Sequence, residues 1–194
     1  MSIIRPDRRG HGFTLTEAVV SMGLMGLAGT LMMGYLIFFA RLNLRYQSVQ
    51  ETLSFSEKAL NTVMSELSWS RSESIRRDAT IAGIVIPRAC KVESSALQFD
   101  SSGVPIWSSW RAFGVNSGNL WSAEQAFVTP VTSGGELTTG PPQAPSNWRR
   151  RVLLRNVKAF EVSGPSNRAY RVRLFTTTSN GYQVEFVASV VPQN

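Results

Sequence analysis

The stretch that decides the fold is FTLTEAVVSMGLMGLAGTLMMGYLIFFA, residues 13 to 40. From Ala18 to Ala40 it has 23 residues without a charge, and a helix needs about 20 apolar residues to span the hydrocarbon core of a bilayer. A cleaved secretory signal fits less well, because its apolar core has about 7 to 15 residues and ends in small ones. A buried core helix is the alternative. We expect a membrane-spanning helix with one carboxylate, Glu17, at its head.

The segment before this helix is short and basic. Residues 1–12, MSIIRPDRRGHG, hold three arginines against one aspartate. Basic residues that precede a spanning helix keep that end in the cytoplasm, so we expect the rest of the chain on the other side of the membrane. The whole chain has a net charge of +7 and a pI near 10.3. This charge permits an anionic partner without requiring one.

The helix is predicted to continue beyond the apolar run. Between Tyr35 and Ala82 there is no glycine or proline. Within residues 41–78, apolar residues recur at steps of three, four and seven, which is the period of an amphipathic helix. The apolar positions are Leu42, Val49, Leu53, Leu60, Val63, Met64 and Leu67. A helix from Phe13 to Arg76 would be about 95 Å long at 1.5 Å per residue.

The remainder, residues 79–194, is predicted to be a β-rich domain, which makes the fold class α+β. The predicted strands lie in residues 80–86, 96–100, 104–110, 150–164 and 170–191. An Asn-Gly pair at 180–181 lies between two alternating runs and predicts a type I′ hairpin. Residues 114–147 are rich in Gly, Ser, Thr, Asn and Pro. We expect them to form long surface loops, with at most a short element near 124–129.

The residue inventory argues against catalysis. The chain has one cysteine, Cys90, and one histidine, His11, so it has no internal disulfide and no His/Cys metal site. No Ser/His/Asp set or phosphate-binding loop is present, and the acids of the β-rich region form no close pair in the sequence. We therefore expect no enzyme, no cofactor and no metal. Cys90 is expected to be a small buried apolar residue.

The motif GFTLTE at 12–17, followed by an uninterrupted apolar helix, resembles the class III signal of type IV prepilins and pseudopilins. The short basic leader, the glycine before the cut, the phenylalanine after it and the glutamate five residues into the mature chain all match. The resemblance implies that a prepilin peptidase removes residues 1–12 by cutting between Gly12 and Phe13, and that the new Phe13 amine is methylated. It also implies a helix with a membrane half, 13–40, and a soluble half, 41–78, packed on an antiparallel sheet domain.

A second, weaker resemblance concerns the subfamily. Three segments are similar to W-type minor pilins and to the J-type minor pseudopilins of type II secretion. They are VMSELSWSRSESIRR (63–77), LLRNVKAFEV (153–162) and ASVVPQN (188–194). The chain departs from many major pilins, because its spanning segment has Gly34 near the place of their kinking proline and it lacks their paired C-terminal cysteines.

Glu17 acquires a role from the resemblance. A carboxylate at the centre of a spanning helix costs about 2.5 to 3.5 kcal/mol, and less near the interface. In a filament, Glu17 of one subunit would meet the Phe13 amine of a neighbour. This ion pair would offset the cost in a low dielectric and set the axial stagger between subunits. The alternative is that Glu17 only reaches out to the lipid headgroups.

Small residues recur along one face of the spanning helix. Gly26, Thr30 and Gly34 are four residues apart, a spacing that lets helices approach closely in lipid. We expect this row to pack against other subunits. The alternative is that these glycines are tolerated without a packing role.

A basic run follows near the C-terminus, with Glu161 as its one acid. It comprises Arg149, Arg150, Arg151, Arg155, Lys158, Arg168, Arg171 and Arg173. Trp148 and Tyr170 flank it, and bases interleaved with aromatics can bind nucleic acid. Arg171 and Arg173 are expected to share one face of a strand. The preferred interpretation is a solvated sheet face or a contact with an acidic neighbouring subunit.

These features together predict a non-catalytic minor pilin or pseudopilin of the bacterial inner membrane. It would prime or cap a type IV pilus or a type II secretion pseudopilus. Its partners would be other pilin subunits, the prepilin peptidase, the inner-membrane assembly platform and the membrane. The alternatives are a DNA-uptake minor pilin that binds nucleic acid through the basic run, a major filament subunit and, least favoured, a membrane-anchored enzyme.

Overall fold

The computed structural model describes residues 14–89, 96–132, 137, 140–141, 144–166 and 168–192. The helix α1, Leu15–Trp69, is continuous over 55 residues. It ends seven residues before the expected Arg76, and a short 3-10 helix at Ser72–Ser74 follows it. The chain divides into two compact units, 1–46 and 47–194, so the boundary falls inside α1. The long N-terminal helix and the antiparallel sheets confirm an α+β layout.

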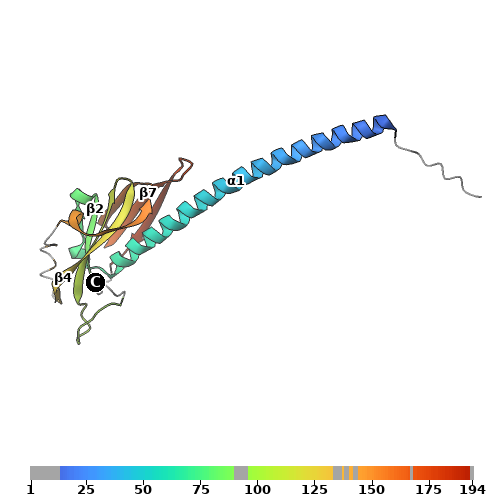
Figure 1. Cartoon of the computed structure of the whole chain (residues 1–194). Helices are drawn as coiled ribbons and strands as arrows, with labels where there is room; N and C mark the ends of the chain where they lie inside the picture. Colours follow the sequence, from blue (N-terminus) through green and yellow to red (C-terminus); the bar gives the residue numbers. More distant parts are fainter. Residues whose placement is uncertain are drawn as a thin grey trace, which may run out of the picture. The chain divides into compact units, whose positions relative to one another are not determined.

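Among the described residues, the second unit contains eight strands in two antiparallel sheets. Figure 1 labels three of these strands, β2, β4 and β7. The strands are β1 Arg76–Asp78, β2 Gly83–Arg88, β3 Trp107–Asn116, β4 Asn119–Val131, β5 Arg150–Arg155, β6 Val157–Ser166, β7 Ala169–Thr177 and β8 Gln183–Val190. The larger sheet has the order β1-β2-β3-β4-β5 and the smaller sheet the order β6-β7-β8. Every consecutive pair within each sheet is antiparallel.

The main core lies between the second part of α1 and both sheets. Ala59, Leu60, Val63 and Leu67 are the buried apolar residues of α1, and they recur at steps of one, three and four along one helix face. They belong to one cluster with apolar side chains of β2 to β7, such as Phe113. The amphipathic period of residues 59–67 therefore positions the helix on the sheets, as the sequence predicts.

A second core covers the other face of the five-stranded sheet. It contains four tryptophans, Trp107, Trp110, Trp121 and Trp148, together with Leu137 from the segment that follows β4. Because both faces of this sheet are covered, β3 and the start of β4 are buried on both sides. The sequence prediction of long loops over 114–147 is therefore wrong for its first half, where β3 ends and β4 runs.

The strand predicted at 150–164 is divided between the two sheets. Asn156 interrupts it with a φ of 60°, so that β5 closes the five-stranded sheet and β6 begins the three-stranded one. The Val157 N–H donates to the Gly118 carbonyl at 2.8 Å, which ties the start of β6 to the β3–β4 turn. One continuous stretch of sequence therefore supplies an edge strand to each sheet.

The type I′ turn does not lie where the sequence predicts it. The β7–β8 hairpin is present, but only Gly181 of the Asn180-Gly181 pair has a positive φ, at 84°. The Gly181 N–H donates to the Thr178 carbonyl at 2.9 Å, and the Thr178 N–H donates to the Tyr182 carbonyl at 2.8 Å. This is a three-residue loop with a glycine bulge and not a type I′ turn. The type I′ geometry lies at 117–118, between β3 and β4, where both residues have a positive φ of 50° and 73°.

Candidate functional site

The first part of α1 exposes an apolar surface. In the described part of the chain, α1 is the one helix long and apolar enough to cross a membrane, and its most apolar window contains no buried residue. The exposed side chains include Leu24, Met25, Leu31 and Met32. Soluble monomeric proteins rarely expose a continuous apolar surface of this kind. The first part of α1 is therefore a candidate membrane anchor.

Glu17 takes part in a capping box at the start of this helix. The Thr14 N–H and the Thr14 hydroxyl both donate to Glu17 Oε2 at 3.0 Å, and the Glu17 N–H donates to Thr14 Oγ1 at 3.3 Å. This reciprocal pair satisfies backbone donors of the first turn, which have no partner inside the helix. The signal for it, Thr-x-x-Glu at 14–17, is present in the sequence, and our sequence analysis missed it.

The capping box does not use the whole carboxylate. Glu17 Oε1 has no hydrogen-bond partner within the described residues, and the residue lies on the exposed surface. The acid therefore serves the helix locally and still presents an acceptor to another molecule. Phe13 and Gly12, which the sequence analysis assigns to the cleavage site and to pairing with Glu17, lie outside the described residues.

The row of small residues on α1 is open. A methyl group placed on Gly26 or Gly34 would meet nothing within 4 Å outside the neighbouring helix backbone. The Thr30 hydroxyl between them donates to the Leu27 carbonyl at 2.8 Å, so its polar group is satisfied within the helix. The row carries no charged side chain, so another helix could approach it closely.

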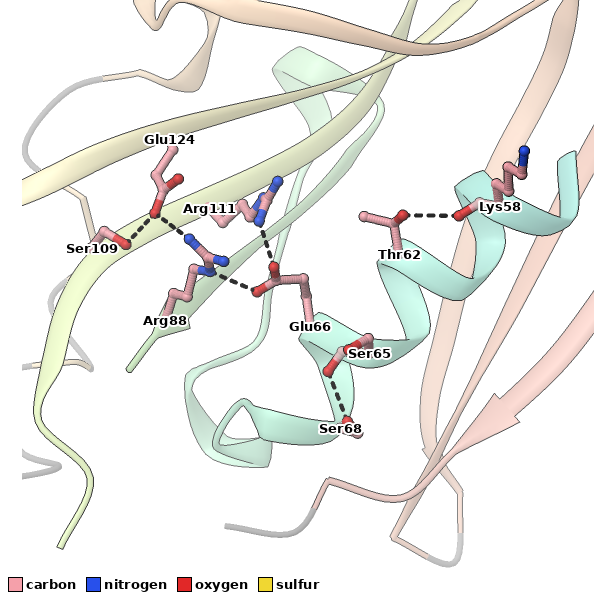
Figure 2. A network of polar contacts seen from close by, with 9 residues as sticks. All are labelled: Lys58, Thr62, Ser65, Glu66, Ser68, Arg88, Ser109, Arg111 and Glu124. Atoms are coloured by element: carbon pink, nitrogen blue, oxygen red, sulfur yellow. Dashed lines mark hydrogen bonds and ion pairs between the residues drawn. The ribbon is translucent and has the colours of Figure 1, made fainter. Parts of the chain in front are cut away.

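A network of four charged side chains joins α1 to the five-stranded sheet (Figure 2). Glu66 of α1 accepts from Arg88 Nε at 3.1 Å through Oε2 and from Arg111 through Oε1. Glu124 of β4 accepts from Arg88 Nη1 at 3.1 Å and from the Ser109 hydroxyl at 2.6 Å. Two arginines thus face two glutamates, and the network has no net charge.

The sheet register brings these side chains together. Arg111 lies directly opposite Glu124 in the β3–β4 pair, and Arg88 lies directly opposite Ser109 in the β2–β3 pair. The charged side chains are only 13 to 17% exposed. Burial at this level is costly for an unpaired charge, so each charge depends on the others. The network holds the end of α1 on the sheet.

The basic run is divided between the two sheets. Its β5 members, Arg150, Arg151 and Arg155, belong to the five-stranded sheet, and its β7 members, Arg171 and Arg173, belong to the three-stranded sheet. Along β7 these two arginines alternate with buried Val172 and Leu174. The prediction that Arg171 and Arg173 share a strand face is therefore confirmed.

Several members of the run already have partners. Arg150 lies over the Trp121 ring at 4.4 Å and donates to the Ser146 carbonyl at 3.0 Å. Arg173 Nε donates to Glu185 at 2.7 Å, and its Nη1 lies 3.5 Å from Glu161. This bond to Glu185 raises the pKa of the Arg173 guanidinium. The remaining members, Arg149, Arg151, Arg155, Lys158, Arg168 and Arg171, are exposed.

The two aromatic residues that flank the run are buried. Trp148 is 7% exposed and Tyr170 is 5% exposed. The Tyr170 hydroxyl donates to the Ser72 carbonyl at 2.9 Å, and burial raises the pKa of this phenol, against the opposing charge of Arg77. Neither ring offers a face on which a base could stack. In the described part of the chain, no three His, Cys, Asp or Glu residues lie close enough to hold a metal ion.

Comparisons with models of known families, with characterised proteins and with solved structures found no match to the chain.

Proposed function

We propose that this chain is a non-catalytic minor pilin or pseudopilin subunit of a type IV pilus or type II secretion pseudopilus. The observation that carries the proposal is the placement of the helix start. α1 begins at Leu15, two residues beyond the cut that the GFTLTE motif implies. Removal of residues 1–12 would leave a mature chain that begins directly with an exposed apolar helix.

Two further features support this proposal. The first part of α1 has an apolar surface that no described residue covers, as an element that packs among other helices in lipid requires. The second part is held on antiparallel sheets by the main core and by the Glu66 network. A helix with one open half and one anchored half is suited to assembly, with the leader cytoplasmic and the sheets outside the cytoplasm.

The local geometry of Glu17 refines its proposed role. Before assembly, the capping box satisfies one oxygen of the carboxylate and places its charge at the positive end of the helix dipole. Both effects lower the cost of keeping an acid at the head of an apolar helix. In an assembled filament, the free Oε1 of Glu17 would accept a hydrogen bond from the methylated Phe13 amine of a neighbouring subunit.

The placement of the basic run favours a solvated face or a subunit contact over a nucleic-acid site. Its charges are spread over two sheets, Arg150 and Arg173 already have partners, and the flanking rings of Trp148 and Tyr170 are buried. An exposed, continuous basic stripe with accessible aromatics is the usual footprint of single-strand binding. We therefore keep filament assembly as the proposed function.

Processing is the direct test. Co-expression with an active prepilin peptidase is expected to give a mature chain that has lost 12 residues and begins with N-methyl-Phe13, as measured by intact mass of the membrane-extracted protein. Gly12→Leu is expected to block the cut and leave membrane insertion intact. A main species that retains Met1 under active peptidase, or one cut after Ala40, would overturn the proposal.

A pair of variants separates the two roles of Glu17. Glu17→Leu removes the carboxylate, and Thr14→Val removes the hydroxyl of the cap while it keeps the charge. We expect Glu17→Leu to insert at least as well as wild type but to incorporate poorly into filaments. Thr14→Val should lose only about 1 kcal/mol of helix stability and should still incorporate. Equal incorporation of Glu17→Leu and wild type at native expression would refute the pairing with Phe13.

A further inference from the structure

The last strand of the chain has an open edge. β8 pairs with β7 in unbroken antiparallel register over eight residues, from Tyr170 opposite Val190 to Thr177 opposite Gln183. Among the described strands, β7 is its only partner. The backbone N–H and C=O groups of every second β8 residue therefore point away from the sheet, where no described strand meets them.

The side chains of β8 leave the core incompletely covered beneath this edge. The residues that face inward are only half-buried, whereas the inward residues of β7 are at most 5% exposed. The half-buried set is Val184, Phe186, Ala188 and Val190. Phe186, Ala188 and Val190 pack against the main core. An added strand would extend the sheet and cover the exposed sides of these residues.

The edge of β8 also lacks the features that protect other edges. β6, at the opposite side of the same sheet, has two register shifts, and β5, at the edge of the larger sheet, carries three arginines. β8 has no proline, no lysine or arginine and no bulge. Bulges, prolines and inward or edge charges are the usual means of preventing strand addition.

We propose that the open edge of β8 binds an extended segment of a different polypeptide by strand addition. β7 indicates which chemistry β8 accepts, because its inward residues are mostly apolar and Arg173 donates to Glu185 from its outward face. The added segment has the same character, with apolar side chains at alternate positions and a basic residue facing Glu185. A second copy of β8 fits less well, since Glu185 is the one charge of that strand and a copy would bring no base to it. This proposal goes beyond assembly through α1 and does not depend on it.

The test uses the full-length chain in detergent and a fluorescent peptide with the sequence of β7, AYRVRLFTT. A peptide of the same composition in which the apolar and polar residues do not alternate is the control. We expect saturable binding of the alternating peptide, and increased hydrogen-exchange protection of β8 amides without a change in α1. The alternating peptide should bind at least about tenfold more tightly than the control, since each well-placed cross-strand pair contributes.

Two matched variants locate the binding. Val187 is 45% exposed on the outer face of β8, so Val187→Lys adds an edge charge and Val187→Thr keeps the shape and strand propensity. Val187→Lys is expected to weaken peptide binding about tenfold, and Val187→Thr to leave it within about twofold. If Val187→Lys does not fold, Ser189→Lys at the neighbouring exposed position gives the same readout.

Three results would overturn the proposal. Equal binding of the two peptides would show that no strand is added. Equal binding to the Lys and Thr variants would place the peptide elsewhere. The chain could also associate with itself. If Val187→Lys abolished that self-association and the peptide did not compete with it, a second copy would occupy the edge.

Discussion

Replacement of Glu66 by glutamine should strongly destabilise the strand-rich unit. Glu66 is the acid on α1 that contacts both arginines of the network, one through each carboxylate oxygen. Glu66→Gln keeps the size of the side chain and one acceptor, and removes the charge. Arg88 and Arg111 would then share the single negative charge of Glu124 in a site where the side chains are 13 to 17% exposed.

The magnitude follows from the burial of the network. Removal of one partner from a buried ion pair costs about 3 to 5 kcal/mol. The glutamine oxygen retains one hydrogen bond, which is worth about 1 kcal/mol. We therefore expect the free energy of unfolding to fall by about 2 to 4 kcal/mol. For a unit of this size, 1 kcal/mol corresponds to about 2 to 4 °C, so the melting temperature should fall by about 4 to 16 °C.

The assay is thermal and urea denaturation of the full chain in detergent, followed by near-UV circular dichroism of the buried tryptophans. Glu57→Gln is the matched control, because Glu57 is an exposed acid on the same helix. It should change the free energy of unfolding by no more than about 0.5 kcal/mol. A double-mutant cycle of Glu66→Gln with Arg111→Gln should give a coupling energy of about 1 to 3 kcal/mol. If Glu66→Gln cost no more than Glu57→Gln, the network would not hold α1 to the sheet.

Three further outcomes can be measured on the same unit. Gly83→Ala should cost about 1 to 3 kcal/mol or more in urea denaturation, because its methyl group would overlap the Phe113 carbonyl of the paired strand; an unchanged midpoint would contradict this. Tyr170→Phe should cost about 1 kcal/mol below pH 10 through loss of the bond to Ser72. Because burial raises the pKa of Tyr170, wild type should lose stability as pH rises through that raised pKa, and a parallel loss in the Phe variant would exclude this cause. A fragment of residues 47–194 should melt cooperatively and be rich in strand, and an aggregated product would place the unit boundary elsewhere.

The sequence predicted the helix well because its signal is local. An uninterrupted apolar run and a helical period without glycine or proline are visible in a short window. The helix ends at Trp69 and not at Arg76, since Ser70 already bonds to the Leu67 carbonyl through both its N–H and its hydroxyl. Such a side-chain bond to the last turn competes with continuation of the helix. The serine-rich composition alone does not show at which residue the helix ends.

The sequence failed for β4 because of how that strand is buried. Leu120 belongs to the main core and Trp121 to the second core, and Ser122 between buried neighbours is itself 3% exposed. A strand covered on both faces shows no alternation of apolar and polar residues. Its one serine and two alanines then resemble the composition of a loop. Only knowledge of the second core, built from residues far along the chain, identifies it as a strand.

The sequence also misplaced the type I′ turn. Asn-Gly at 180–181 favours a two-residue turn, but Ser179 adds a third loop residue and moves the positive φ to Gly181 alone. Ser117-Gly118 has the weaker local signal and adopts the type I′ turn. In each hairpin the number of loop residues selects the turn type, and the Asn-Gly dipeptide alone does not fix that number.

Two acids on one helix show what a sequence can and cannot specify. Glu17 and Glu66 both stand beside apolar residues of α1. The Thr-x-x-Glu motif at 14–17 signals the cap of Glu17, whereas no local motif reveals the two arginines that contact Glu66. Glu66 obtains two arginines from strands 22 and 45 residues later in the same chain, so its charge is fully used when the chain folds. Glu17 obtains only the Thr14 cap and keeps one oxygen without a partner among the described residues. The two oxygens of Glu66 both bond to arginines of the same unit. Glu17, with one oxygen unpartnered among the described residues and an uncovered apolar surface beside it, is suited to contact with another molecule. The difference between the two carboxylates is the physical reason to expect the strand-rich unit to fold within one chain and the first part of α1 to be completed by its neighbours.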